Sequence, residues 1–208
     1  MELIYHFPFT ENANDVVRGV ILNNSNGVTF DDRGANFNGI NQSLRQPALP
    51  IPITAANFPN GMVFEFEINA NSDQRMNPTI FTTSASGVGS NDSFFCYEFA
   101  LIGFIAGANS SVVVRTSPPE LHTTLFFQSS YFPKDAYNRV YLKVTPDGRS
   151  AEFNGIVPTV QLSENSDLFR YTNIQKDGIT FGFLSHLWQP HTRYFRGFIR
   201  NFKVYRVK

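Results

Sequence analysis

The sequence predicts an all-β protein, an antiparallel jelly-roll β-sandwich with about a dozen short strands in two packed sheets. Aromatic residues make up 15% of the 208 residues, mainly 22 Phe and 8 Tyr, and aromatic side chains favour the half-buried surface of a sheet. Clusters of Gly, Asn, Asp and Pro interrupt the chain about every ten to fifteen residues, and the runs between them are rich in Val, Ile, Phe, Tyr and Thr. No run of about eleven residues carries the i, i+3, i+4, i+7 apolar pattern of an amphipathic helix.

One domain is expected to hold the whole chain, residues 1–208, because all-β sandwiches reach about 200–250 residues without splitting. The sequence contains no internal repeat, low-complexity segment or linker. A short helical turn is expected at residues 163–170, where Ser163 can cap the turn while Leu168 and Phe169 face inward.

The expected β elements follow one another along the chain. They span residues 3–9, 27–30, 34–44, 62–68, 93–99, 137–144, 151–155, 178–184 and 195–207. Turn-forming clusters separate them, such as Asp31-Asp32 and the Pro146-Asp147-Gly148 run.

Period-two alternation predicts which side chains face the core. Within residues 62–68, Phe64, Phe66 and Ile68 alternate with Val63, Glu65 and Glu67, which places the carboxylates outward on a solvated face. The predicted inward-facing set is Phe37, Phe64, Phe66, Val140, Leu142, Phe181, Ile199 and Phe202.

Charge and cysteine content exclude several classes of partner and linkage. The 17 acidic and 17 basic side chains cancel, and the sequence lacks the clustered Lys and Arg with which proteins bind phosphate backbones, so no nucleic-acid partner is expected. No apolar run approaches the ~20 residues of a membrane span, so no membrane insertion is expected. The single Cys96 excludes an intramolecular disulfide and is expected to be a buried, unreactive thiol.

Several motifs occur in the order of a known group of domains. The closing residues 195–205 read F-x-G-x-I-x-x-F-x-V-Y and follow a short run that ends in Phe-Gly. The opening Tyr-x-Phe at residues 5–7, the Gly-x-x-Phe-x-Gly type element at 34–44 and the run 137–155 with its Asp-Gly turn stand in matching positions. Together these motifs resemble those of laminin G-like and pentraxin-like domains in the concanavalin A-like lectin/glucanase superfamily. Tyr137 stands where that pattern has Trp, and Asn154 where it has Asp.

The resemblance implies a fold and a class of function. It implies that the first and last strands lie side by side, and that the domain recognises ligands, most often sugars, without catalysing a reaction. It also implies calcium in rim loops, where Ca²⁺ would need six to eight oxygen ligands. The acidic loop residues are scattered and form no D-x-D-x-D run, so no cofactor is expected, with calcium left as an alternative: Asp15, Asp31, Asp32, Asp73, Asp92, Asp135, Asp147 and Asp167.

The loop at residues 185–194 holds the densest collection of side chains suited to ligand recognition. Trp and Tyr rings can stack on the apolar face of a sugar, while His, Gln and Arg can hydrogen-bond its hydroxyls. The predicted ligand-binding residues are His186, Trp188, Gln189, His191, Arg193 and Tyr194. In the alternative interpretation, Trp188 packs beneath the loop as a structural anchor and the histidines are solvated.

Glycoside hydrolysis is an alternative that the resemblance raises, because jelly rolls of this type include glucanases with an E-x-D-x-x-E motif on one strand. Glu65 and Glu67 share one face of an expected strand, but the intervening Asp and the third acid are missing. The sequence also lacks G-x-S-x-G, H-E-x-x-H and phosphate-loop motifs, so no enzymatic activity is expected.

Two classes of function remain open. The first is a lectin-like domain that binds glycans or a glycosylated protein surface, at an extracellular, cell-surface or virion-surface location. The second is a structural or protein–protein interaction module of a viral, phage or microbial surface assembly without a sugar site. No signal-peptide pattern begins the sequence, since acidic Glu2 directly follows Met1.

Overall fold

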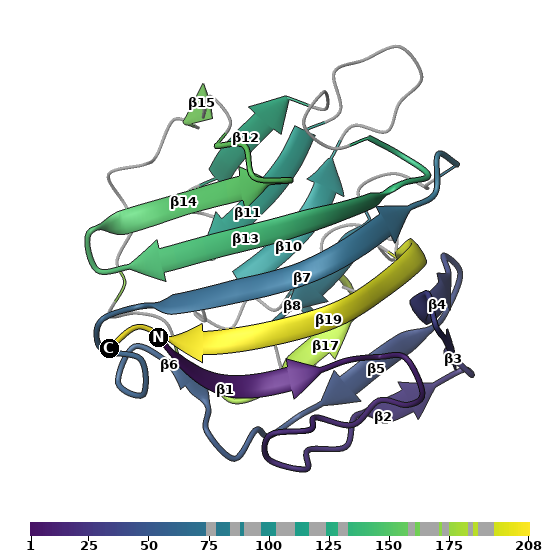
Figure 1. The fold of residues 1–208 in the computed structure, drawn as a ribbon, viewed down its shortest axis with the longest axis horizontal. Coiled ribbons are helices and arrows are strands. Elements are labelled where there is room, and N and C mark those ends of the chain that lie inside the picture. The colour runs from purple at the N-terminus through teal and green to yellow at the C-terminus, as the bar shows by residue number, and fades with distance from the viewer. Residues whose placement is uncertain are drawn as a thin grey trace.

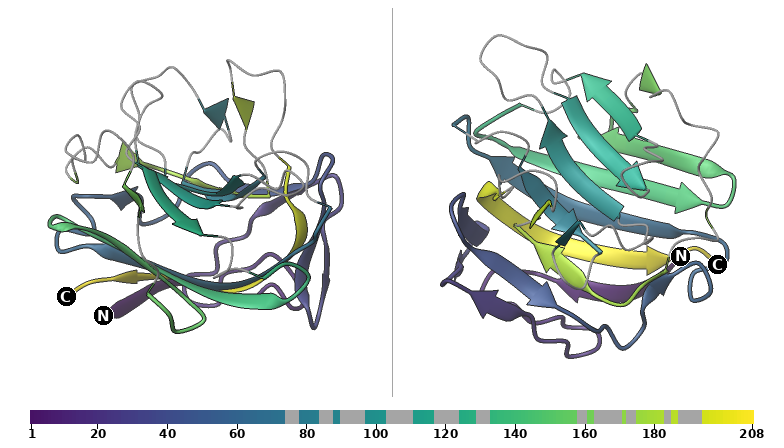
Figure 2. Two further views of the ribbon diagram at one scale, coloured as in Figure 1. Left: turned by 90° about the horizontal axis from the view of Figure 1, so that it is seen from above. Right: turned by 180° about the vertical axis from the view of Figure 1, so that it is seen from behind.

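The structure, a computed structural model, describes residues 1–73, 78–83, 88–89, 97–102, 111–116, 124–128, 133–157, 161–162, 171, 175–182, 185–186 and 194–208. Within these residues the chain forms two antiparallel sheets that pack face to face, with no α-helix (Figures 1 and 2). The predicted all-β sandwich is therefore confirmed. The described residues contain no helix long and apolar enough to cross a membrane.

The front sheet, which faces the viewer in Figure 1, has the strand order β14-β13-β7-β19-β4-β3, and β1 also pairs with β19. Its strands are β1 (Glu2–Phe7), β3 (Thr29–Asp31), β4 (Gly34–Asn38), β7 (Met62–Ala70), β13 (Tyr137–Thr145), β14 (Gly148–Phe153) and β19 (Arg196–Arg206).

The back sheet has the order β15-β12-β11-β10-β8-β17-β5-β2. Its strands are β2 (Asn23–Ser25), β5 (Ser43–Gln46), β8 (Thr79–Thr82), β10 (Tyr97–Ile102), β11 (Ser111–Thr116), β12 (Thr124–Gln128), β15 (Gln161–Leu162) and β17 (Ile179–Phe181). Two further pairs are short: β6 (Ile53–Thr54) with β16 (Gln175–Lys176), and β9 (Val88–Gly89) with β18 (Ser185–His186).

The first and last strands lie side by side, as the resemblance implied. β1 pairs antiparallel with β19 from Glu2 opposite Arg206 to Phe7 opposite Phe202, and the Glu2 and Arg206 side chains form an ion pair of 2.9 Å. Both chain ends consequently meet at one corner of the sandwich (Figure 1). β1 ends earlier than expected, before Pro8, which has no N–H to donate to a sheet ladder.

The element expected at residues 34–44 is two strands. Gly39 adopts φ 73°, a left-handed conformation that glycine reaches at little cost, and the chain turns there from β4 in the front sheet toward β5 in the back sheet. Asn38 closes the turn, because its Oδ1 accepts a hydrogen bond of 2.9 Å from the Ile40 N–H. The hairpin between β3 and β4 is a turn at Asp32 and Arg33, as the Asp31-Asp32 pair predicted.

Alternation in β7 and β13 has the predicted phase. Phe64, Phe66 and Ile68 are buried, whereas Glu65 and Glu67 lie on the outer face. Val63 also stands at an outward position, yet it is fully buried between its cross-strand neighbours on β13 and β19.

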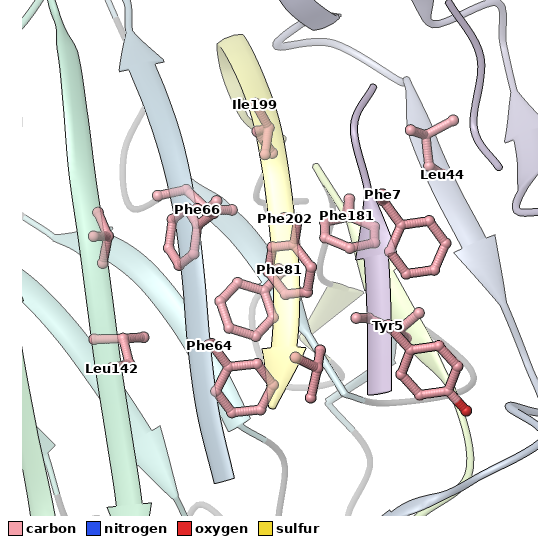
Figure 3. Close-up of a cluster of buried hydrophobic side chains, with 14 of the residues drawn as sticks. Tyr5, Phe7, Leu44, Phe64, Phe66, Phe81, Leu142, Phe181, Ile199 and Phe202 are labelled. Atoms are coloured by element: carbon pink, nitrogen blue, oxygen red, sulfur yellow. The ribbon is translucent and has the colours of Figure 1, made fainter. Parts of the chain in front are cut away.

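The core between the sheets is largely aromatic (Figure 3). Phe202 of β19 lies 4.7 Å from Phe181, 4.9 Å from Phe81 and 5.6 Å from Phe66, measured between ring centroids. Every side chain predicted to face inward is buried: Phe37, Phe64, Phe66, Val140, Leu142, Phe181, Ile199 and Phe202. The expected helical turn at 163–170 and Cys96 lie outside the described residues.

Candidate functional site

The predicted binding loop at residues 185–194 is described only at its two ends. Ser185 and His186 form β18, which runs parallel to β9 on the side of the back sheet that faces away from the front sheet (Figure 2, left). Tyr194 is half-buried and leads into Phe195, which is fully buried with its ring 5.9 Å from that of Phe37. The loop therefore returns to the sandwich at an anchored position.

The remaining predicted binding residues, Trp188, Gln189, His191 and Arg193, lie outside the described residues. Their clustering with His186 and Tyr194 stays a prediction.

A groove with a volume of about 530 Å³ lies at the end of the front sheet where β7 and β4 end and β19 begins. Arg196 forms part of the groove wall and follows Tyr194 by two residues, so the end of the predicted loop adjoins the groove. The groove is lined by Asn36, Phe37, Asn38, Gly39, Ile40, Asn71, Asp73, Arg196 and Phe198.

An aromatic ring and several amides meet in and beside this groove. Phe198 is half-buried on the outer face of β19, where its cross-strand neighbours are Asn36 on β4 and Asn69 on β7. Asn71 follows β7, and its N–H donates a 3.2 Å hydrogen bond to the carbonyl of Arg196. Within the described part of the chain, the side-chain amides of Asn36, Asn69 and Asn71 form no hydrogen bond, which leaves them available to a ligand.

Glycine allows the strands to approach closely enough to form the groove. A Cβ at Gly197 would lie 2.1 Å from the carbonyl oxygen of Asn69, and one at Gly39 would lie 2.8 Å from the Cβ of Arg196. Gly197 also has φ 136°, in the region that favours glycine. A larger residue at either position would push apart the walls that hold Phe198 and Arg196.

Three arginines lie on or near the outer face beside Phe198, and each has a carboxylate partner. Arg196 pairs with Asp73 in the groove itself. Arg33 lies 4.5 Å above the Phe198 ring centroid and is 2.6 Å from Asp31.

Arg200, one outward position further along β19, is 2.6 Å from Glu67 and lies 3.9 Å above the ring centroid of Tyr137. The Tyr137 hydroxyl in turn donates a hydrogen bond to the carbonyl of Arg33. This chain of contacts fixes the outer face beside the groove.

The carboxylate pair considered for hydrolysis does share one face, as predicted, but both members are bound by cations. Glu65 contacts Arg139 at 2.8 Å and Lys203 at 3.9 Å. Partial burial raises the pKa of Glu67, but hydrogen bonds from Arg200 and Asn201 outweigh it and the pKa lies below its usual value. A general acid for glycoside hydrolysis needs a raised pKa. The lowered pKa of Glu67 instead fits its role in the ion pair with Arg200. Glu67 faces outward as predicted, but it is bound by Arg200 and Asn201 and is not merely solvated.

Two of the acidic loop residues, Asp15 and Asp135, accept hydrogen bonds from backbone N–H groups. Asp15, which is 2% exposed, accepts backbone hydrogen bonds of 2.6 Å from His6 and Arg18 and so holds the turn after β1. Asp135 accepts one of 3.0 Å from Ser72. No cluster of three or more His, Cys, Asp or Glu that could hold a metal occurs among the described residues.

The groove was not predicted from the sequence. Alternation around Gly197 and Ile199 does indicate that Arg196 and Phe198 face outward together. Their neighbours Asn36 and Asn71, however, come from distant segments, and only the strand order and register bring them together.

No protein-family model and no curated protein matches this chain. Among solved structures, domain 4 of the arabinanase AbnA from Geobacillus stearothermophilus, solved with arabinotriose, has a TM-score of 0.60 and 14% identity over 99% of this chain and 92% of that one. The binding domain of botulinum neurotoxin serotype D/C has a TM-score of 0.70 and 13% identity over 100% of this chain.

The mouse laminin α1 domains LG4-5 have a TM-score of 0.56 and 11% identity over 91% of this chain. The chain spans 49% of the toxin chain and 43% of the laminin chain, so about half of each. These similarities confirm the fold predicted from the sequence motifs: the chain has the jelly-roll β-sandwich fold of these domains.

Proposed function

We propose that this chain is a non-catalytic recognition domain that binds carbohydrate in the groove beside Phe198 and through the adjoining loop at residues 185–194. The observation that carries the proposal is the position of Phe198 between Asn36 and Asn69. A sugar presents an apolar C–H face and a set of hydroxyls, and an aromatic ring flanked by unbonded amides complements both. A volume of about 530 Å³ lies within the range of small-ligand sites, about 300–1,000 Å³.

The loop at residues 185–194 contributes to this site because its C-terminal end leads into the groove. Tyr194 stands two residues before Arg196, so the end of the loop adjoins the groove wall. The proposed contacts from the loop are stacking by Trp188 or Tyr194 and hydrogen bonds from Gln189, His191 or Arg193. His186 lies in β18, beyond the back sheet, and would contact only a ligand that extends that far. The arabinanase domain of the same fold was solved with arabinotriose, which supports a glycan or a glycosylated protein surface as the partner.

A structural or protein–protein module is the second candidate, and one observation favours it. Val16 and Ile21 are 66% and 63% exposed on the segment that follows β1. Exposed apolar side chains that gather on one segment are typical of protein contact surfaces. In that case the groove would bind no sugar.

A glycan array, probed with this chain, tests the proposal. The matched variants are Phe198→Ala in the groove and Tyr141→Ala, which removes another half-buried aromatic ring from the outer face of the same sheet. We expect Phe198→Ala to weaken binding of the best glycan by about tenfold, the equivalent of ~1.4 kcal/mol, and Tyr141→Ala to leave it unchanged. Absence of binding to any glycan, or equal losses in both variants, would contradict a sugar site in the groove.

The same array in the presence of EDTA tests the metal. Because the acidic loop residues Asp15 and Asp135 accept hydrogen bonds from backbone N–H groups, we expect binding to be the same with and without chelator. Loss of binding in EDTA, restored by added Ca²⁺, would instead assign a calcium-dependent site.

A further inference from the structure

Each of the three arginines near Phe198 is paired with a carboxylate. Arg196, which lines the groove, pairs with Asp73. Arg33, which lies over one face of the Phe198 ring, pairs with Asp31, and Arg200 pairs with Glu67. Each guanidinium group beside the groove thus has its own carboxylate, and Asp32, which also acts on the charge of Arg33, adds a further negative group.

The Asp31–Arg33 pair is fixed more firmly than an ordinary surface ion pair. The backbone N–H of Arg33 donates a 2.8 Å hydrogen bond to Asp31. The guanidinium and the carboxylate each contribute two atoms to their contact. The carbonyl of Arg33 also accepts from the Tyr137 hydroxyl. Arg33 therefore lies over one face of the Phe198 ring with its charge matched by Asp31, and a ligand anion would have to compete with that carboxylate.

An acidic ligand would meet a carboxylate beside every cation. To bind Arg196, the carboxylate or sulfate of an acidic sugar must displace Asp73 or lie next to it, and like charges at such distances repel. The attraction gained is small, because Arg196 and Asp73 are 47% and 58% exposed and solvent screens such pairs.

Three side-chain amides in and beside the groove form no hydrogen bond within the described part of the chain. Asn36, Asn69 and Asn71 each offer both a donor and an acceptor, and a sugar hydroxyl likewise donates and accepts. From this combination of paired charges and unbonded amides we infer that the groove selects an uncharged stretch of glycan and discriminates against sialylated, sulfated or uronic-acid forms. This inference rests on the proposed sugar-binding function.

Matched glycans test the inference. The array carries neutral oligosaccharides next to their sialylated, sulfated and uronic-acid counterparts, at about 0.15 M salt so that weak surface charge effects are screened. We expect the neutral form to bind about two- to fivefold more tightly than its acidic counterpart. Equal or tighter binding of the acidic form would overturn the inference and leave the sugar-binding function standing, whereas no binding to any glycan would overturn both.

The variant Asp73→Asn tests whether the Arg196–Asp73 pair, and not the overall charge of the protein, weakens the binding of acidic glycans. The substitution removes the carboxylate that competes for Arg196, so we expect the acidic glycan to gain about two- to fivefold in affinity while the neutral one is unchanged. Asp147→Asn is the control, because it makes the same charge change on an exposed turn at the opposite end of the front sheet. A gain of equal size in both variants, or no gain in Asp73→Asn with its thermal unfolding midpoint preserved, would contradict the role of the Arg196–Asp73 pair.

Discussion

The rings of Phe202 and Phe181 meet edge to face between the two sheets, with their centroids 4.7 Å apart. Phe202 belongs to β19 in the front sheet and Phe181 to β17 in the back sheet, and both are fully buried. This contact joins the two layers at the centre of the core (Figure 3).

Replacing Phe202 by Ala should lower the free energy of unfolding by about 3–5 kcal/mol, because it leaves a cavity among several aromatic rings. Urea denaturation followed by fluorescence measures the loss. Phe198→Ala, on the outer face of the same strand, should cost about 1 kcal/mol, in the range of ordinary substitutions away from the core. Similar losses in the two variants would mean that the register of β19 is wrong.

The ion pair between Glu67 and Arg200 should contribute measurably but modestly to stability. Their atoms are 2.6 Å apart and both side chains are about 30% exposed, so a double-mutant cycle with Glu67→Ala and Arg200→Ala should give a coupling of roughly 0.5–1 kcal/mol. Glu67→Ala alone should cost somewhat more, about 1–1.5 kcal/mol, since Asn201 also loses its 3.1 Å hydrogen bond. Purely additive single effects would show that Glu67 is merely solvated.

His6 should make the fold less stable as the pH falls below about 6.5. Its Nε2 is buried without a hydrogen-bond partner in the described structure. Burial lowers the pKa of His6 from 6.5, and the charge of Lys203 adds to the effect, while a hydrogen bond with Asn201 and the charges of Asp15 and Glu65 oppose it. Below pH 6.5 the unfolded chain therefore binds a proton at His6 before the folded chain does, so stability declines until the lower folded pKa is reached.

Urea unfolding between about pH 8 and 5.5 measures this decline. His6→Gln removes the titrating group and should flatten the slope below pH 6.5. Because His122, His186 and His191 remain in both proteins, the difference between the two slopes belongs to His6. Identical slopes would contradict the assignment.

Trp188→Ala should weaken glycan binding by about tenfold and change the free energy of unfolding by less than about 0.5 kcal/mol, if the ring stacks on the sugar. Binding on the array and urea denaturation, measured on the same preparation, separate the two roles of this side chain. A large loss of stability with binding preserved would identify Trp188 as an anchor of the loop, and the ligand would then have to be held by the groove alone.

The sequence was sufficient to predict burial wherever a long strand alternates strictly. In β7 and β13 the period of two predicted the buried positions of Phe64, Phe66, Val140 and Leu142. In β19 the alternation breaks at Asn201, and the structure gives the reason: this residue has φ 52° and lies in a register shift between Arg200 and Lys203. Such bulges insert a residue and reverse the phase of everything that follows.

Contacts between distant segments could not be predicted from local patterns. The parallel pairing of β18 with β9 joins residues far apart in the chain, and neither two-residue run carries a recognisable signal. The groove depends likewise on Asn36 and Asn69 standing on opposite sides of Phe198, which is a matter of register and strand order. The residues that the sequence pointed to lie in the loop, where composition is unusual, while those of the groove look like ordinary strand residues.

The position of β19 has a consequence for how the protein is made. The last strand of the chain pairs with β7 along one edge and with β4 and β1 along the other, so it fills the middle of its sheet. β19 is synthesised after all of its partners in the sheet, and until it is made β7, β4 and β1 expose unpaired edges that are prone to pair with other chains. Pairings such as Glu2 with Arg206 span nearly the whole sequence, and such long loop closures slow folding. The front sheet is therefore completed only once β19 has emerged from the ribosome, and protection of the nascent chain by chaperones should raise the yield of folded protein more than it would for a domain built from neighbouring hairpins.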